Sequence, residues 1–336
     1  MLRSLFGRRL LPTTDLYFMH HLRDRVAPAL ALPRTRRRCP VRVFAPNVFV
    51  CGRRAVVIRY ARPKDIIRLE RLRPERVFYL VDDNFKELAE APGLPEDYRR
   101  RLQVFARDML PRIEALADVI VAPNRYLLAS YPRHEHAILE PGYVRVLSDE
   151  VHWEAPSHLK LAFLGTRSHL GDLEQIAPAL AAVVERNPSV TLTTYLGPHA
   201  PRELSGRDRI FHHKPLGWAT FKRDVLLGEC FHIAIAPMRA TPFNRGRSFN
   251  KVLDHAAVGA AGLYSAGPPV ADVIEHGKDG LLIGDDPDAW LGALEGLLHD
   301  HARARSLAAE GANLARRIGD PLRVRRFWAE RLGFPP

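Results

Sequence analysis

Residues 231–259 read FHIAIAPMRATPFNRGRSFNKVLDHAAVG, and this stretch indicates the fold class. Residues 231–236 form an apolar run interrupted only by His232, which is typical of a buried strand, and Pro237 ends the run. Residues 249–258 carry apolar side chains at helical spacing. A buried strand followed by a covering helix is the repeating unit of parallel α/β sheets.

The same alternation continues along the chain on both sides of this stretch. Short runs rich in Val, Ile and Phe predict strands at 41–45, 55–60, 77–81 and 119–122. Further short runs predict strands at 159–164, 190–196 and 262–265. Apolar residues at helical spacing predict helices at 64–73, 96–117, 173–186, 218–227, 287–298 and 321–332. We therefore predict an α/β fold with parallel sheets covered by helices on both faces.

A segment without periodicity, residues 141–157, separates two series of strands and helices. We predict two Rossmann-like domains, residues 1–145 and 158–320, joined by a linker at 146–157. An Arg-rich helix in residues 321–336 follows a break at Pro321, and we expect it to pack back on the first domain. The two sheets would face a central cleft, because ligands in such folds bind beyond the carboxyl ends of the strands.

The positive charge is concentrated in one part of the chain. The 336 residues carry a formal net charge of +12, and residues 1–76 alone hold 19 basic and 5 acidic side chains. This basic region includes Arg34, Arg36, Arg37, Arg38, Arg53, Arg54, Arg68, Arg71, Arg73 and Arg76. Such a local excess predicts one docking face for an anionic membrane, a nucleic acid or another polyanion.

The cysteine pattern and the hydropathy indicate the cellular compartment of the protein. Cys39, Cys51 and Cys230 are odd in number and form no C-x-x-C pair, which excludes a disulfide scaffold and a zinc ribbon. Reduced thiols fit the cytoplasm. The chain contains no run of 18 apolar residues, so we predict no membrane span. We expect a cytoplasmic protein, located at the inner face of the cytoplasmic membrane if its basic region contacts lipid.

The first candidate site follows the strand at 231–236. Ser248 suits a helix N-cap, and Arg247 and Lys251 would add positive charge to the first turn of the helix, where N–H groups favour anions. Lys251 and Asp254 lie three residues apart and so can share one helix face. This pattern is suited to a diphosphate and a sugar hydroxyl, and it is equally compatible with a solvated surface turn.

The second candidate site is GTRSHLGDL at 165–173, a turn between a strand and a helix. Gly165 permits a ligand to approach the backbone, Arg167 can hold phosphate oxygens in a bidentate fork, and Asp172 can cap the next helix. A plain surface loop is the alternative. Neither G-x-G-x-x-G nor a Walker P-loop occurs in the chain.

Three blocks of the second half resemble, in order, the donor-binding domain of retaining GT-B glycosyltransferases of the group 1 class, specifically a bacterial polysaccharide-building subset. Residues 165–173 are similar to G-T-x-x-H-x-x-D-L. Residues 235–238 and 243–259 are similar to A-P-L followed by F-N-x-x-K-S-x-x-K-x-L-E-x-A-A-x-G, and residues 274–282 match I-x-H-G-x-x-G-L-L. In the first half, YLVDDN at 79–84 and ADVIVAPN at 117–124 resemble the same enzymes more loosely.

The resemblance implies a GT-B fold and transfer of a sugar from a nucleotide-diphosphate sugar, the co-substrate, to a glycan, lipid-linked or other hydroxyl acceptor. It implies retention of configuration and neither a cofactor nor a metal. The donor-binding residues it implies are Gly165, Thr166, Arg167, His169, Asn244, Arg247, Ser248, Lys251 and Asp254, with Arg167 and Lys251 on the diphosphate and Asp254 on the ribose. Asp82 and Asp83, at the end of a predicted strand, are the catalytic candidates, and one of them would orient or deprotonate the acceptor hydroxyl.

The chain departs from the family pattern at two places. Many members carry two Glu eight positions apart, whereas Gly246 and Asp254 stand here. A Gly-rich loop of the first domain is replaced by Ala45-Pro46-Asn47. These departures keep two alternatives open, an inactive GT-B scaffold that binds a glycan or partner protein and a GT-B epimerase. No nucleic-acid module or stacking ladder accompanies the arginines, so we expect no nucleic-acid partner and favour anionic lipid or an acidic lipid-linked glycan.

Overall fold

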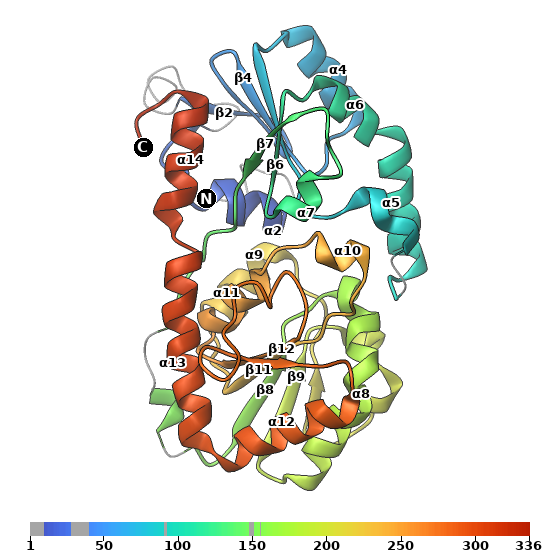
Figure 1. The fold of residues 1–336 in the computed structure, drawn as a ribbon, viewed down its shortest axis with the longest axis vertical. Helices are drawn as coiled ribbons and strands as arrows, with labels where there is room; N and C mark the ends of the chain where they lie inside the picture. Colours follow the sequence, from blue (N-terminus) through green and yellow to red (C-terminus); the bar gives the residue numbers. More distant parts are fainter. Residues whose placement is uncertain (1–9, 28–39, 91–92, 148–150, 155) are drawn as a thin grey trace.

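The computed structural model describes residues 10–27, 40–90, 93–147, 151–154 and 156–336, which form two lobes, each built on one sheet (Figure 1). The first sheet has the order β1 (Val26–Ala27), β2 (Val41–Ala45), β3 (Val48–Cys51), β4 (Arg54–Ile58), β5 (Arg76–Leu80), β6 (Val119–Ala122) and β7 (Glu135–Ile138). The second has the order β10 (Ile210–His212), β9 (Val190–Thr194), β8 (Leu159–Phe163), β11 (Ile233–Ala236), β12 (Ala261–Ser265) and β13 (Leu281–Ile283). The predicted α/β class with two Rossmann-like sheets is confirmed.

The second sheet is parallel throughout, whereas the first also contains two antiparallel pairs. Strand β3, which was not among the predicted strands, pairs antiparallel with β2 and β4. Two tight turns make this possible, with Asn47 at φ 61° and Gly52 at φ 57°, both in the left-handed region. Ala45-Pro46-Asn47 is therefore part of a hairpin.

The helices of the first lobe are α2 (Pro12–Thr14), a π-helical turn at Asp15–Met19, α4 (Pro63–Leu72), α5 (Glu96–Asp108), α6 (Leu110–Leu116) and α7 (Arg125–Leu128). A single helix was expected over 96–117, and the break at Met109 corrects that expectation. Pro111 lies in the first turn of α6 and has no N–H to continue the hydrogen bonding of α5, so the chain starts a new helix there.

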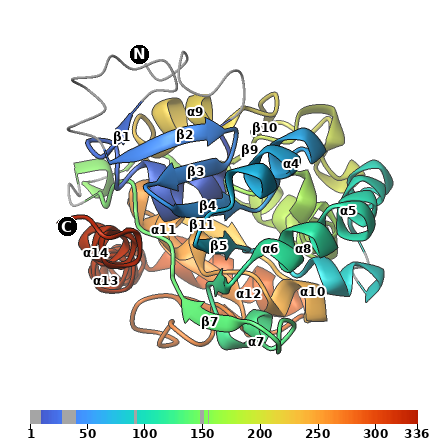
Figure 2. The same cartoon turned by 90° about the horizontal axis from the view of Figure 1, so that it is seen from above.

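The helices of the second lobe are α8 (Leu170–Arg186), α9 (Trp218–Phe221), α10 (Pro242–Arg245), α11 (Asn250–Ala257), α12 (Pro287–His299) and α13 (His301–Ile318). The long helix α13 packs on α11 and β12. A short turn after α13 leads into α14 (Pro321–Leu332), and the two helices run along one side of the molecule past both lobes (Figures 1 and 2).

Helix α14 belongs structurally to the first lobe. Its residues Val324 and Trp328 are fully buried in one core with Phe18 and Phe78, and the Trp328 indole donates a hydrogen bond to the Tyr17 carbonyl at 2.6 Å. The chain therefore passes from the first lobe to the second after β7 and returns to the first at α14.

The two lobes also touch closely on either side of the space between them. A Cβ atom on Gly171 would lie 2.6 Å from the Cα of Gly93, so only glycine fits this contact. Elsewhere, the buried carboxylate of Asp15 accepts hydrogen bonds from Lys222 and from the Trp218 indole of the second lobe. These contacts fix how the cleft residues of the two lobes face one another.

Candidate active site

A cavity of about 630 Å³ lies between the two lobes. The loops that follow the carboxyl ends of the parallel strands line it from both sides: Arg59 after β4, Asp82 and Asp83 after β5, residues 165–169 after β8, Tyr195 after β9 and Met238 after β11. This is the predicted central cleft, located where open α/β sheets bind ligands.

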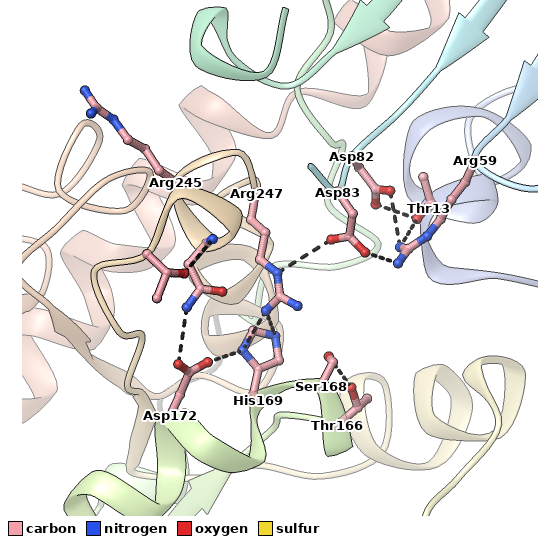
Figure 3. A network of polar contacts seen from close by, with 12 residues as sticks. Thr13, Arg59, Asp82, Asp83, Thr166, Ser168, His169, Asp172, Arg245 and Arg247 are labelled. Carbon is pink, nitrogen blue, oxygen red and sulfur yellow. Dashed lines mark hydrogen bonds and ion pairs between the residues drawn. The ribbon is translucent and has the colours of Figure 1, made fainter. Parts of the chain in front are cut away.

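Asp82 and Asp83 both face the cleft and are both held by Arg59 (Figure 3). Arg59 Nη1 lies 3.2 Å from Asp82 Oδ1, and Arg59 Nη2 pairs with Asp83 Oδ2. The Thr13 hydroxyl donates to Asp82 Oδ2 at 2.5 Å. Burial raises the pKa of Asp82 against the opposing effect of the Arg59 charge. One guanidinium thus pairs with two adjacent buried carboxylates.

Arg59 was not among the predicted site residues. Its side chain is only 15% exposed, and its backbone has φ 56°, in a region that bulky side chains rarely adopt. Burial disfavours its charge, but Asp82 and Asp83 outweigh that effect and raise the pKa of Arg59 well above its ordinary value. The available signal was its position, because an arginine that directly ends a buried strand next to the strand leading to Asp82 must reach the same edge of the sheet.

Arg247 links the two lobes through its side chain and its backbone. Its guanidinium Nε lies 3.5 Å from Asp83 Oδ1 of the first lobe, and its Nη1 lies 2.9 Å from His169 Nε2 of the second. The Asn124 amide of the first lobe donates to the Arg247 carbonyl at 2.7 Å. The predicted residues Asp83, His169 and Arg247 therefore belong to one network across the cleft (Figure 3).

His169 is neutral in this network. Burial, reinforced by the charge of Arg247, lowers its pKa to about 4. A neutral ring satisfies both neighbours when Nδ1–H donates to Asp172 Oδ2, 3.1 Å away, and Nε2 accepts from Arg247. His169 therefore fixes the orientation of the Arg247 side chain without competing for its charge.

Asp172 does not cap the helix as expected. It lies buried in the first turn of α8, where its Oδ1 accepts hydrogen bonds from the Arg239 backbone N–H at 3.0 Å and from the Asn244 amide at 3.2 Å. Asn244 is itself buried and also donates to the Arg239 carbonyl. Asn244 thus braces the loop that carries Arg247, and neither Asn244 nor Asp172 supplies a free group on the main cleft wall.

Lys251 and Asp254 lie together in the cleft on one face of α11, at 2.7 Å between Nζ and Oδ2. Lys251 also donates to the Leu164 carbonyl at 2.7 Å. Ser248 lines the cleft but is not the N-cap, because α11 starts at Asn250 and the N-cap position is Phe249, which makes no side-chain cap. The first N–H groups of α11 are thus left without a side-chain partner at the N-cap, beside Lys251.

Gly165, Thr166 and Arg167 form the turn after β8 and line the cleft. A Cβ atom on Gly165 would lie 2.2 Å from the Phe163 ring, so this backbone position requires glycine. The Thr166 hydroxyl lies 3.0 Å from that of Ser168. Arg167 pairs with Asp97 of the first lobe at 2.9 Å, apart from the Arg247 network.

Gly246 fills its position for a steric reason. A Cβ atom there would lie 2.8 Å from the Cβ of Asn84, which follows Asp83 in the first lobe. Asn84 is buried, and neither polar atom of its amide has a hydrogen-bond partner among the described residues. Many of the resembling enzymes carry a glutamate at this position, whereas here the close contact between the lobes leaves no room for a side chain.

One end of the cleft is apolar. Tyr195, Pro215, Leu216, Trp218 and Phe221 of the second lobe line it, and Leu10, Leu11, Pro12 and Leu16 of the first lobe lie opposite. Together with the charged end, this gives a cavity that can take a ligand with a flat apolar part and an anionic part.

The described part of the chain shows neither a metal site nor a membrane span. No group of three or more His, Cys, Asp or Glu side chains within it is arranged to hold a metal ion. None of its helices combines the length and the apolar character needed to cross a bilayer.

The chain matches no known protein-family pattern and no curated protein sequence. Solved structures do match. HepE of Anabaena in complex with UDP-glucose has a TM-score of 0.55 at 12% identity, over 83% of this chain and 78% of that one. Sucrose-phosphate synthase of Thermosynechococcus elongatus has a TM-score of 0.55 at 15% identity, over 83% and 73%.

An α,α-trehalose-phosphate synthase (UDP-forming) of Burkholderia vietnamiensis is similar to the same degree, with a TM-score of 0.55 at 11% identity over 83% of this chain and 71% of that one. At these identities the likeness establishes the fold and not the activity. The chain has the GT-B fold.

Proposed function

We propose that the chain is a glycosyltransferase that moves a sugar from a nucleotide-diphosphate sugar to a hydroxyl acceptor on a glycan or a lipid-linked molecule. The observation that carries this proposal is the arrangement across one cleft of Arg247 and Lys251 on the second lobe and of Asp82 and Asp83 on the first. Cations suited to a diphosphate thus face carboxylates suited to a hydroxyl.

The donor would lie against the second lobe. Its diphosphate would contact Arg247, Lys251 and the first N–H groups of α11, with Arg167 recruited from its exposed pair with Asp97. Asp254 would accept hydrogen bonds from the ribose, and the nucleobase would lie in the apolar end beside Tyr195 and Trp218. The cations would stabilise the negative charge that grows on the diphosphate as the sugar–phosphate bond breaks.

The acceptor would lie against the first lobe. Asp83 Oδ2 is held by Arg59, whereas its Oδ1 faces Arg247. A diphosphate that takes Arg247 as its partner would release Oδ1 to accept the proton of an acceptor hydroxyl. We propose that the reaction proceeds with retention by front-face attack, and that it needs no metal.

We further propose that the two domains have different roles. Residues 1–145 would form the acceptor-side domain and residues 158–320 the donor domain, with a linker at 146–157 and residues 321–336 completing the first domain. The protein would work in the bacterial cytoplasm at the inner face of the membrane, in polysaccharide synthesis.

Calorimetry with UDP, GDP and ADP tests the donor site, followed by release of nucleoside diphosphate from the corresponding nucleotide sugars. Lys251→Ala should abolish binding and turnover together. Lys278→Ala, which removes an exposed lysine of the same lobe paired with Glu275, should change neither. If none of the three nucleotides binds, the proposal is wrong.

The contact between Gly246 and Asn84 favours a second candidate, an inactive GT-B scaffold, because no carboxylate projects from position 246. A scaffold would bind nucleotide or glycan without releasing product. Turnover of any nucleotide sugar, with the product identified, separates the transferase from the scaffold and from an epimerase.

A further inference from the structure

One face of helix α4 combines cations with exposed apolar side chains. Lys64, Ile67, Arg68, Arg71 and Leu72 are all exposed, whereas Asp65, Ile66 and Leu69 of the same helix are buried. The exposed residues follow the spacing i, i+3, i+4, i+7 and i+8, so they form one continuous stripe along the helix. We call these five residues the α4 stripe.

The charge of the α4 stripe is not neutralised by its neighbours. Every carboxylate of residues 60–76 already pairs with another arginine: Asp65 with Arg62, Glu70 with Arg112 and Glu75 with Arg53. Within the described part of the chain, Lys64, Arg68, Arg71 and the adjacent Arg73 have no carboxylate partner. Arg34, Arg36, Arg37 and Arg38, which also belong to the basic region, lie outside the described residues.

The apolar members of the α4 stripe decide the kind of partner. Ile67 is 36% exposed and Leu72 45% exposed, and the stems of Lys64, Arg68 and Arg71 extend the apolar surface between them. A nucleic acid would need cations alone or cations with stacking aromatics. A helix with apolar side chains flanked by long cations is typical of one lying in the interface of an anionic bilayer.

We propose that the α4 stripe is a docking surface for an anionic lipid bilayer. Lys64, Arg68, Arg71 and Arg73 contact the phosphate groups of the lipids, and Ile67 and Leu72 enter the layer between headgroups and acyl chains. Each cation near such a surface strengthens binding by roughly fivefold, and each buried aliphatic side chain by about tenfold.

The position of α4 connects this surface to the cleft. Arg59 lines the cleft and Pro63 begins the helix, so the connecting segment spans at most about 14 Å. A docked α4 holds the acceptor side of the cleft next to the headgroup layer, which suits an acceptor carried by a lipid. This last step alone rests on the proposed transferase function.

Sedimentation with vesicles of phosphatidylglycerol and phosphatidylcholine, compared with phosphatidylcholine alone, tests the surface. The protein should bind the anionic vesicles at low salt and dissociate from them as the salt concentration rises. It should not bind the neutral vesicles. The variant Lys64→Ala/Arg68→Ala/Arg71→Ala should bind on the order of a hundredfold more weakly. The variant Ile67→Ser/Leu72→Ser keeps the charge and should still bind at least about tenfold more weakly.

A matched variant controls for charge. Arg202→Ala/Arg303→Ala/Arg317→Ala removes the same charge from exposed positions of the second lobe and should bind like the original. Thermal melting and UDP calorimetry of each variant establish that the fold and the cleft are intact, so failure of lipid binding is distinguishable from failure of the donor site. The proposal is overturned if the original protein ignores anionic vesicles, or if the control loses as much binding as the α4 variants.

Discussion

Arg247 of the second lobe reaches across the cleft to Asp83 of the first lobe, with 3.5 Å between Nε and Oδ1. Both side chains are buried, and each has a second partner on its own lobe, His169 for Arg247 and Arg59 for Asp83. The arginine proposed to bind the diphosphate and a candidate catalytic carboxylate thus form an ion pair with each other. A diphosphate that binds Arg247 must replace Asp83.

Removing Arg247 should weaken nucleotide binding. Hydrogen bonds to charged groups contribute about 1.5–3 kcal/mol, so Arg247→Ala should raise the Kd of UDP about tenfold to a hundredfold in calorimetry. Arg245→Ala is the control, because Arg245 is exposed, stacks on Tyr126 and points away from the network (Figure 3). Equal losses in both variants would mean that Arg247 has no specific role in binding.

Removing Arg59 should destabilise the fold. Arg59→Met leaves Asp82 and Asp83 buried without their common cation, which should cost about 3–5 kcal/mol in urea unfolding at neutral pH. The loss should shrink in acid, because protonation of Asp82, whose pKa burial raises, removes the need for a counter-charge. Arg53→Ala, which breaks a pair in which Arg53 is 72% exposed, should cost no more than about 1 kcal/mol.

A methyl group at position 246 should push the lobes apart. Gly246→Ala brings a Cβ to within 2.8 Å of Asn84 and should destabilise the protein by about 1–3 kcal/mol in urea unfolding. A Cβ atom on Gly292 of α12 would meet nothing within 4 Å beyond its own helix, so Gly292→Ala should instead stabilise that helix by about 0.5–1 kcal/mol. Stabilisation by both substitutions would contradict the close contact.

The stability of the protein should fall as the solution is acidified below neutrality. His169 has a folded pKa of about 4, below its ordinary value of 6.5, so the unfolded chain binds the proton more readily. Its contribution is complete above pH 6.5 and disappears as the pH falls from 6.5 to 4. His20, His21 and His232 have the same lowered pKa, about 4, and add to the loss.

Urea unfolding at about pH 7.5 and about pH 5, on either side of the ordinary histidine pKa, measures this effect. His169→Gln should lose less stability between the two conditions than the original protein, because one proton-binding difference has been removed. If His169→Gln and the original protein lost the same stability between the two pH values, the pKa of His169 would not differ between the folded and unfolded chain.

The elements that could be predicted were those with a strong local signal. Short apolar runs marked β5, β6, β8 and β11 closely, and Pro321 marked the start of α14. Strand β3 has such a run, but it lies between two turns that need Asn47 and Gly52 in left-handed geometry, a signal that is local yet easily overlooked. The Pro111 break was also readable but was outweighed by the longer helical pattern.

The site was only partly predictable because its pairings join residues distant in the chain. The spacing of Lys251 and Asp254 foretold their contact, since both lie on one helix face. Arg59, Asp83 and Arg247 meet only after two lobes have folded and packed, and no spacing in the sequence encodes that. The reason for Gly246 likewise lies in Asn84, on the other lobe.

The return of α14 to the first lobe has a consequence for biosynthesis. Trp328 completes a core whose other members include Phe18 and Phe78, so that core stays open to water until a ribosome has passed residue 328 and released the helix from its tunnel. The second lobe, whose strands and α13 precede α14, can fold earlier. The lobe made first is therefore the lobe finished last, and during that interval its apolar surface is the part of the nascent chain most in need of a chaperone.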